Sequence, residues 1–206
     1  QVGNTHPGAM NPFGMVSACA YSGAYPTGYG LHEMSTEGVP PTLFDRLEAS
    51  GFTHFQQSGT GAIRKYYNYF RVTPMLDPLD ELGTSWSLTD EVAEPGYYAA
   101  TLGSGIRCEL TVGPKSAAHR YTFPASSDAR VVIDFSNGGL AIEHGETVPM
   151  RAHLQTVGSN AVQGEIVVEG VPLAVHIECD APGWRQMLWY ARRLMAGGSR
   201  LDFDSI

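Results

Sequence analysis

The densest group of polar side chains lies in the segment GFTHFQQSGTG, residues 51–61, where a histidine, two amides and several hydroxyls stand among glycines. If this segment is extended, His54, Gln56 and Ser58 face the same side, because side chains alternate along a strand. A row of imidazole, amide and hydroxyl groups can hydrogen-bond neighbouring hydroxyls of a sugar. The alternative is that these groups satisfy one another and the nearby backbone in a buried loop.

A second segment, NTHPGAMNPFGMV, covers residues 4–16. Its Gly14 permits close approach to the backbone. The segment could instead be a turn-rich lead-in whose Phe13 and Met15 fill the core. Trp86, between two serines, is either an exposed aromatic platform for a sugar face or an ordinary core side chain.

Other signatures of chemistry are absent or incomplete. Glycosidic cleavage usually needs two carboxylates, and no pair of acidic residues stands out. The seven histidines include no close pair on one strand or helix face, which argues against a self-contained metal site. The glycines of SGTGAIRK, residues 58–65, have the wrong spacing for a phosphate-binding loop.

Composition excludes several classes of partner. The net charge of −8 argues against a nucleic-acid surface, which needs clustered Lys and Arg. No apolar run approaches the roughly 20 residues of a membrane helix. Cys19, Cys108 and Cys179 lie far apart, so at most one disulfide could form, and we favour buried free thiols. The start at Gln1 fits either a processed export product or a chain whose beginning is missing.

The elements that position these residues are mainly strands. Short bursts of apolar residues are separated by Gly and Pro turns, so we predict an all-β chain with one domain over residues 1–206 and a sandwich or barrel architecture. One short helix is predicted at residues 41–50, with Pro41 at its start and Gly51 as its stop. The predicted strands cover residues 15–20, 66–74, 97–102, 106–112, 119–123, 131–135, 165–169 and 173–179.

The C-terminal part is less regular. Residues 184–195 carry an apolar stripe at helical spacing and only partly fit a strand pattern. Residues 200–206 show no closing strand or cap, which favours a chain that continues elsewhere.

Taken in order, several stretches resemble the N-terminal domain of glycoside hydrolase family 92, the exo-acting α-mannosidases. The matching stretches cover about two thirds of the chain: NTHPGAMNPFGMV (4–16), GY (28–29), GFTHFQQSGTG (51–61), VTP (72–74), SLTDEVAEPGYYAATL (87–102), GIRCELT (105–111), HRYTFP (119–124) and VVIDF (131–135). The family loop usually reads GFSHTHLSGTGC, so Phe55, Gln56, Gln57 and Ala62 depart from it, and the insertion at residues 40–50 is unusual. Such changes could alter the sugar or the linkage that is accepted.

The resemblance implies an antiparallel β-sandwich of the galactose-mutarotase-like (supersandwich) type, packed on a C-terminal α/α barrel. It implies an inverting, calcium-dependent hydrolysis of α-mannosides, with the carboxylates and most calcium ligands on the barrel, which this chain lacks. It also implies a strand at residues 184–195, in place of the helix that their apolar spacing indicates. No catalytic or metal-binding residue is therefore assigned here. The expected substrate-facing residues are Phe13, Gly14, His54, Gln57, Ser58 and Thr60.

We accordingly expect part of a secreted or periplasmic glycosidase that is inactive alone, with a mannoside-type glycan and the catalytic barrel as its partners. A non-catalytic carbohydrate-binding sandwich is the alternative. A purely structural domain is the third possibility.

Overall fold

In the computed structural model of this chain, every regular element among the described residues is a strand, and none is a helix. The described residues are 6–22, 29, 48–55, 67–76, 85–126, 128–135, 139–140, 150–168, 170–180, 187–190, 193–195 and 198–205. All the strand ladders are antiparallel, which confirms the predicted class. The chain divides into two compact units, Gln1–Glu146 (unit 1) and Thr147–Ile206 (unit 2). The sequence predicted that residues 1–206 form one domain. Whether these two units associate as one domain stays a prediction.

The first sheet of unit 1 has the strand order β1-β2-β4-β6-β11. Its strands are β1 (Ala9–Met10), β2 (Ser17–Ala20), β4 (Phe52–Thr53), β6 (Arg71–Met75) and β11 (Arg130–Asp134). A separate short ladder joins β5 (Tyr67–Asn68) to β12 (Gly139–Leu140). Every residue of β6 is buried, and this strand lies between β4 and β11 in the sheet.

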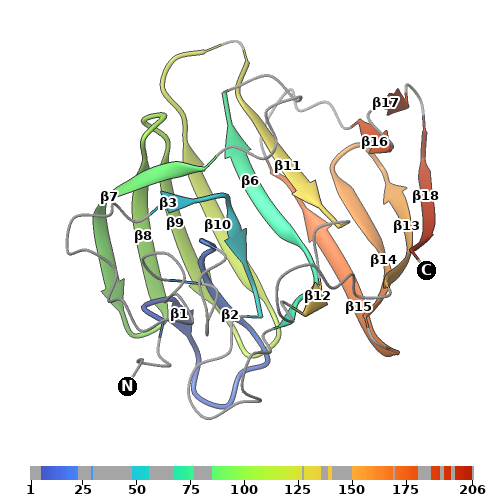
Figure 1. Ribbon diagram of the computed structural model, residues 1–206, viewed down its shortest axis with the longest axis horizontal. Coiled ribbons are helices and arrows are strands. Elements are labelled where there is room, and N and C mark those ends of the chain that lie inside the picture. The colour runs from blue at the N-terminus through green and yellow to red at the C-terminus, as the bar shows by residue number, and fades with distance from the viewer. Residues whose placement is uncertain are drawn as a thin grey trace, which may run out of the picture. The chain divides into compact units, whose positions relative to one another are not determined.

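The second sheet of unit 1 has the order β10-β9-β8-β7-β3, and Figure 1 shows β7, β8, β9 and β10 side by side. Its strands are β3 (Glu48–Ala49), β7 (Trp86–Glu94), β8 (Tyr97–Leu102), β9 (Arg107–Val112) and β10 (Ala117–Thr122). Half-buried and exposed side chains alternate along β10, as expected of a strand with one face toward a core. The β7–β8 ladder changes register between Thr89 and Val92, and Asp90 has a positive φ of 50° there.

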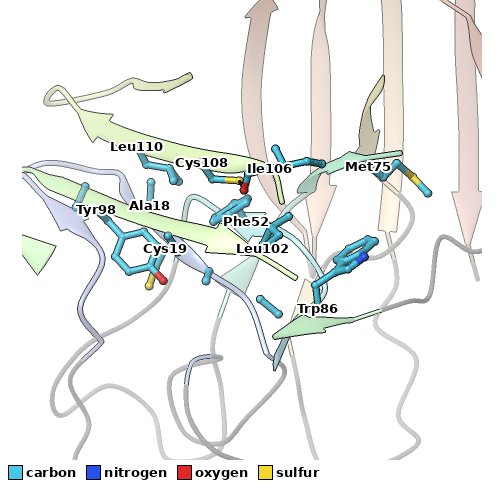
Figure 2. Close-up of a cluster of buried hydrophobic side chains, with 14 residues drawn as sticks. Ala18, Cys19, Phe52, Met75, Trp86, Tyr98, Leu102, Ile106, Cys108 and Leu110 are labelled. Carbon is cyan, nitrogen blue, oxygen red and sulfur yellow. Dashed lines mark hydrogen bonds between the residues drawn. The ribbon is translucent and has the colours of Figure 1, made fainter. Parts of the chain in front are cut away.

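The core of unit 1 lies between these two sheets. Figure 2 shows Phe52 of the first sheet among side chains of the second, including Leu102 and Cys108. Burying a large apolar side chain contributes about 1.5–3 kcal/mol, so this shared core holds the two layers together as a sandwich. Its buried members are Ala9, Ala18, Cys19, Ala20, Ala49, Phe52, Met75, Trp86, Tyr98, Ala100, Leu102, Ile106, Cys108 and Leu110.

Unit 2 contains a four-stranded sheet in the order β15-β14-β13-β18. Its strands are β13 (Met150–Val157), β14 (Ala161–Val168), β15 (Val171–Glu178) and β18 (Arg200–Ser205), and a separate hairpin joins β16 (Leu188–Tyr190) to β17 (Arg193–Met195). Alternation along β13 buries Ala152 and Leu154 and exposes His153 and Gln155. One face of this sheet is therefore apolar and the other polar.

Most predicted strands are confirmed, including the replacement of a helix by strands within residues 184–195. Three expectations need correction. Residues 41–47 of the predicted helix lie outside the described residues, but its last part forms strand β3. No strand was predicted at residues 86–94, which form the nine-residue strand β7, and Trp86 lies in the core, as the core alternative required. Residues 200–205 form strand β18 rather than an irregular end.

The three cysteines are free thiols, and Cys19 and Cys108 are buried, as predicted. Within the part of the chain that the structure describes, no helix is long and apolar enough to cross a membrane.

Candidate functional site

The turn at residues 11–14 presents the most exposed aromatic side chain among the described residues. Gly14 N–H donates to Asn11 O at 2.8 Å, and Phe13 has a positive φ of 61° at the third position of this turn. That conformation is a genuine outlier for a bulky residue. Phe13 is fully exposed, and Met10 and Met15 are exposed beside it in the sequence.

This turn is anchored to the second sheet. Met15 N–H donates to Pro114 O at 2.7 Å, in the connection between β9 and β10. A Cβ added at Gly14 would lie 3.1 Å from Asn11 O, so the turn is tightly closed. The alternative in which Phe13 fills the core is wrong, because its side chain projects into solvent.

The segment that begins at Gly51 is fitted closely against β6. A Cβ at Gly51 would lie 2.6 Å from Thr73 Oγ1 and 2.9 Å from Val72 O, and Gly51 has a φ of 145°. Thr73 Oγ1 donates to Ser50 O at 3.1 Å, and Tyr21 N–H donates to Gly51 O at 2.8 Å. Only glycine fits here, so the sequence motif reflects close backbone packing at its start.

His54 is buried rather than displayed. Its Nε2 lies 2.8 Å from His119 Nε2, and its ring packs on Phe70 with the ring centroids 4.7 Å apart. Burial lowers the pKa of His54 to about 4. Burial, followed by the charge on His54, holds the pKa of His119 well below its ordinary value. Both imidazoles are therefore neutral near pH 7.

The remaining predicted residues, Gln57, Ser58 and Thr60, lie outside the described residues, as does Gln56. The predicted row of His54, Gln56 and Ser58 is consequently represented by His54 alone. The structure places Phe13 and Gly14 at a surface turn and His54 in the interior, and their predicted contacts with a sugar stay predictions.

The sequence reasoning missed the partners that hold these segments. His6 Nδ1 accepts from Gly8 N–H at 3.0 Å, and its Nε2 contacts Ser17 Oγ at 3.1 Å. Ser17 N–H in turn donates to His54 O at 2.9 Å. The histidines of the two motifs are thus linked through β2. The alternating pattern of HRYTFP could have suggested an inward-facing His119, but nothing local identifies its partner.

A further cluster surrounds the irregularity in β7. Glu91 Oε1 accepts from Tyr98 at 2.6 Å and from Tyr29 at 2.8 Å. Burial, followed by the neighbouring Cys19, raises the pKa of Tyr98, and burial, followed by the hydrogen bond to Glu91, raises the pKa of Tyr29. Arg107 Nη1 donates to Asp90 O at 2.8 Å on the same stretch. These contacts keep both phenols protonated and tie residue 29 to the second sheet.

The polar face of unit 2 forms a shallow hollow of about 630 Å³. Within it His153 Nδ1 lies 2.7 Å from Asp202 Oδ1, and Arg200 Nε donates to Asp202 Oδ2 at 2.6 Å. Hydrogen bonds from Arg200 and then His153 lower the pKa of Asp202. The described residues that line this hollow include none of the predicted site residues.

No group of three or more His, Cys, Asp or Glu side chains among the described residues is arranged to hold a metal ion. Calcium requires six to eight oxygen ligands. The described residues therefore do not fit a calcium site, and no chemical step is assigned to a metal here.

Comparison with known proteins gives a consistent family. The model of the glycosyl hydrolase family 92 N-terminal domain matches residues 1–184. An uncharacterized secreted glycosidase of Arthroderma benhamiae is 32% identical over 133 residues, which are 59% of this chain and 16% of that protein. A family GH92 inverting mannosidase from Bacteroides thetaiotaomicron has the same fold over 89% of this chain and 27% of its own, with a TM-score of 0.55 and 17% identity. The chain spans well under a third of either relative. Its extensive match to the family model shows that it belongs to the glycosyl hydrolase family 92 N-terminal domain family.

Proposed function

We propose that this chain is the sandwich portion of a glycosidase that hydrolyses α-mannosides with inversion, and that it forms one wall of a substrate pocket. The catalytic carboxylates and most of the calcium ligands belong to a C-terminal α/α barrel. The sandwich is of the galactose-mutarotase-like type, and the complete enzyme is secreted or periplasmic. The chain by itself is inactive.

The observation that carries the proposal is the exposed turn of residues 11–14 in a chain of this family. Phe13 is fully exposed in a left-handed conformation, and backbone strain of this kind clusters at functional sites. The turn is held by hydrogen bonds at Gly14 and Met15, so the aromatic ring is preorganised at the surface. An aromatic face can stack on the C–H groups of a sugar ring.

The other wall residues have two kinds of role. Gly14 gives close access to the backbone beside Phe13, and Gln57, Ser58 and Thr60 supply hydrogen bonds to hydroxyls. His54 is also assigned to the wall, but its burial favours a supporting role beneath it. Two sequence-distant motifs then contribute to the same pocket.

The proposal predicts that the complete enzyme depends on Phe13 for turnover. In the complete enzyme, Phe13→Ala should lower kcat/KM on an aryl α-mannoside by about 5- to 30-fold, because a lost stacking contact of about 1–2 kcal/mol has that size. Lys115→Ala is the matched control, since Lys115 is exposed in the turn that anchors Met15 and has no assigned role. If the two variants changed kcat/KM equally, Phe13 would have no special role in the wall of the pocket.

The isolated chain separates the alternatives. Incubation with an aryl α-mannoside and calcium should give no hydrolysis, and turnover would contradict the division of labour between sandwich and barrel. Calorimetric titration with mannose and manno-oligosaccharides should show no binding. Measurable binding would favour a carbohydrate-binding module instead. If Phe13→Ala leaves the complete enzyme unchanged and the isolated chain binds nothing, a structural role remains.

A further inference from the structure

Three polar side chains form a hydrogen-bonded series across the interior of unit 1. His119 and Tyr121 lie two residues apart on β10, so both face inward. His119 Nδ1 is hydrogen-bonded to the Tyr121 hydroxyl, and His119 Nε2 is 2.8 Å from His54 Nε2. His54 directly follows β4 in the opposite sheet. The series therefore joins the two layers of the sandwich.

The direction of these hydrogen bonds follows from protonation. Burial, followed by the neighbouring Cys108, raises the pKa of Tyr121 well above its ordinary value, so its hydroxyl keeps its proton and donates to His119 Nδ1. A neutral His119 that accepts at Nδ1 carries its proton on Nε2 and donates it to His54 Nε2. His54 then carries its own proton on Nδ1. That atom is buried and has no hydrogen-bond partner.

The other described side chains that contact the two rings are aromatic and uncharged. Phe70 packs on His54, and Phe52 meets both His119 and Tyr121. In the part of the chain that the structure describes, the titratable groups that face the series are its own three members and Cys108, which pairs with Tyr121 across β9 and β10. Among the described residues, no carboxylate acts on either imidazole. A charge on either ring would therefore lack a compensating partner.

We propose that Tyr121 and His119 are positioning residues for His54: they fix its tautomer and hold the segment of residues 51–55 against the second sheet while both imidazoles are neutral. A proton added at His54 Nε2 would place N–H groups on both Nε2 atoms, and two donors facing each other at 2.8 Å cannot remain in contact. A proton added at His119 Nδ1 would instead remove the acceptor of the Tyr121 hydroxyl. The inference goes beyond the proposed function, because neither the tautomer nor its response to pH requires a sugar.

The tautomers give the direct test. Nitrogen NMR of ¹⁵N-labelled histidine in the chain at pH 7 should show His119 protonated on Nε2 and His54 on Nδ1, with assignments from His54→Gln and His119→Gln. Tyr121→Phe keeps the ring but removes the donor, so His119 should shift toward a mixture of tautomers. A charged imidazole at pH 6, the opposite tautomers, or unchanged nitrogen shifts in Tyr121→Phe would overturn the proposal.

Hydrogen exchange tests the hold on the segment. The Ser17 amide donates to His54 O, and the Thr156 amide of unit 2 donates to Ser199 O, which makes it the control. Opening releases two histidines to ordinary pKa values, so the open fraction should rise by up to about a hundredfold per pH unit below 6.5. After correction for intrinsic exchange, protection at Ser17 should fall with this slope, and protection at Thr156 should not.

His119→Gln leaves one imidazole, and the slope at Ser17 should drop to about tenfold per pH unit. A pH-independent Ser17 amide, or parallel loss at Ser17 and Thr156, would overturn the proposal. If His119→Gln does not fold, the Tyr121→Phe nitrogen spectrum decides the question by itself.

Discussion

Phe13 keeps a left-handed backbone although its side chain gains no burial in return. A non-glycine residue in this region costs about 1–2 kcal/mol. Glycine is the usual residue at the third position of a turn with this geometry. Phe13→Gly should therefore leave the free energy of unfolding unchanged or raise it by up to about 1 kcal/mol, as measured by urea denaturation.

Met15→Gly is the comparison for this substitution, because Met15 is also exposed but has no positive φ. It should lower stability slightly, through the greater freedom of glycine in the unfolded chain. A loss of more than about 1 kcal/mol in Phe13→Gly would mean that the ring is packed and not available to a ligand.

Adjacent tyrosines offer a second test at the level of the residue. Tyr98 is fully buried and donates to Glu91, whereas Tyr97 donates to Glu109 at 2.8 Å from a more exposed position. Tyr98→Phe should cost about 1.5–3 kcal/mol, since a hydrogen bond from a fully buried phenol to a carboxylate is lost. Tyr97→Phe should cost much less, because water replaces its partner. Thermal unfolding measures both variants. Equal losses of unfolding free energy in Tyr98→Phe and Tyr97→Phe would show that the hydrogen bond from Tyr98 to Glu91 contributes no more than the one from Tyr97 to Glu109.

The sequence predicted the candidate site only in part, and His54 shows why. Its glycine-rich surroundings marked the segment correctly as a place of close backbone approach, which Gly51 confirms. Polarity alone could not decide whether the imidazole faces a ligand or another side chain. The deciding partner, His119, is 65 residues away, and such a pairing is set by the packing of two sheets.

At the level of the element, glycine and proline in turns were enough to predict where most strands lie. Two elements that were predicted wrongly or missed, β3 and β7, have local causes. β8 was predicted with its observed bounds, because glycine and proline mark both ends. β7 was missed because its register shifts between Thr89 and Val92, which breaks the alternation of inward and outward side chains. Two residues of the predicted helix form β3 instead, since pairing with β7 outweighs a weak helical preference.

The central strand β14 depends on one glycine. A Cβ at Gly164 would lie 1.9 Å from His153 O in the neighbouring strand β13. Backbone on both sides of β14 prevents an easy shift. Gly164→Ala should therefore destabilise the unit 2 sheet by about 3 kcal/mol or prevent its formation. Hydrogen exchange of the β13 and β14 amides measures the effect.

Gly170→Asn is the matched control, because Gly170 has a φ of 78° and no atom within 4 Å of an added Cβ. Asparagine tolerates the left-handed region, so the loss should stay below about 1 kcal/mol. If Gly164→Ala is tolerated equally well, the close contact between β13 and β14 is not required for the sheet.

At the level of the whole molecule, the two units place their histidines differently. Unit 1 buries His54 and half-buries His119, and neither has a carboxylate partner among the described residues. Unit 2 exposes His153 beside Asp202 and His176 beside Glu178. Sensitivity to mild acid should therefore belong to unit 1.

Lowering the pH from 7 to 5 should destabilise unit 1 selectively. The pKa of His54 in the folded chain is about 4, below its ordinary value of 6.5. Between these two pH values the unfolded chain binds a proton at His54 that the folded chain does not bind. The stabilisation is complete above pH 6.5 and is lost as the pH falls toward 4. At about 1.4 kcal/mol per pH unit, His54 alone removes about 2 kcal/mol by pH 5, and His119 acts in the same direction.

Unit 2 should be nearly unaffected by these groups over the same range, because the lowered pKa of Asp202 matters only below its ordinary value of 3.8. Urea unfolding at pH 7, 6 and 5, followed by hydrogen exchange of peptides from each unit, measures the two responses separately. His119→Gln should reduce the pH dependence of unit 1 and leave unit 2 unchanged. Parallel loss in both units, or earlier loss in unit 2, would show that the buried imidazoles do not control acid stability.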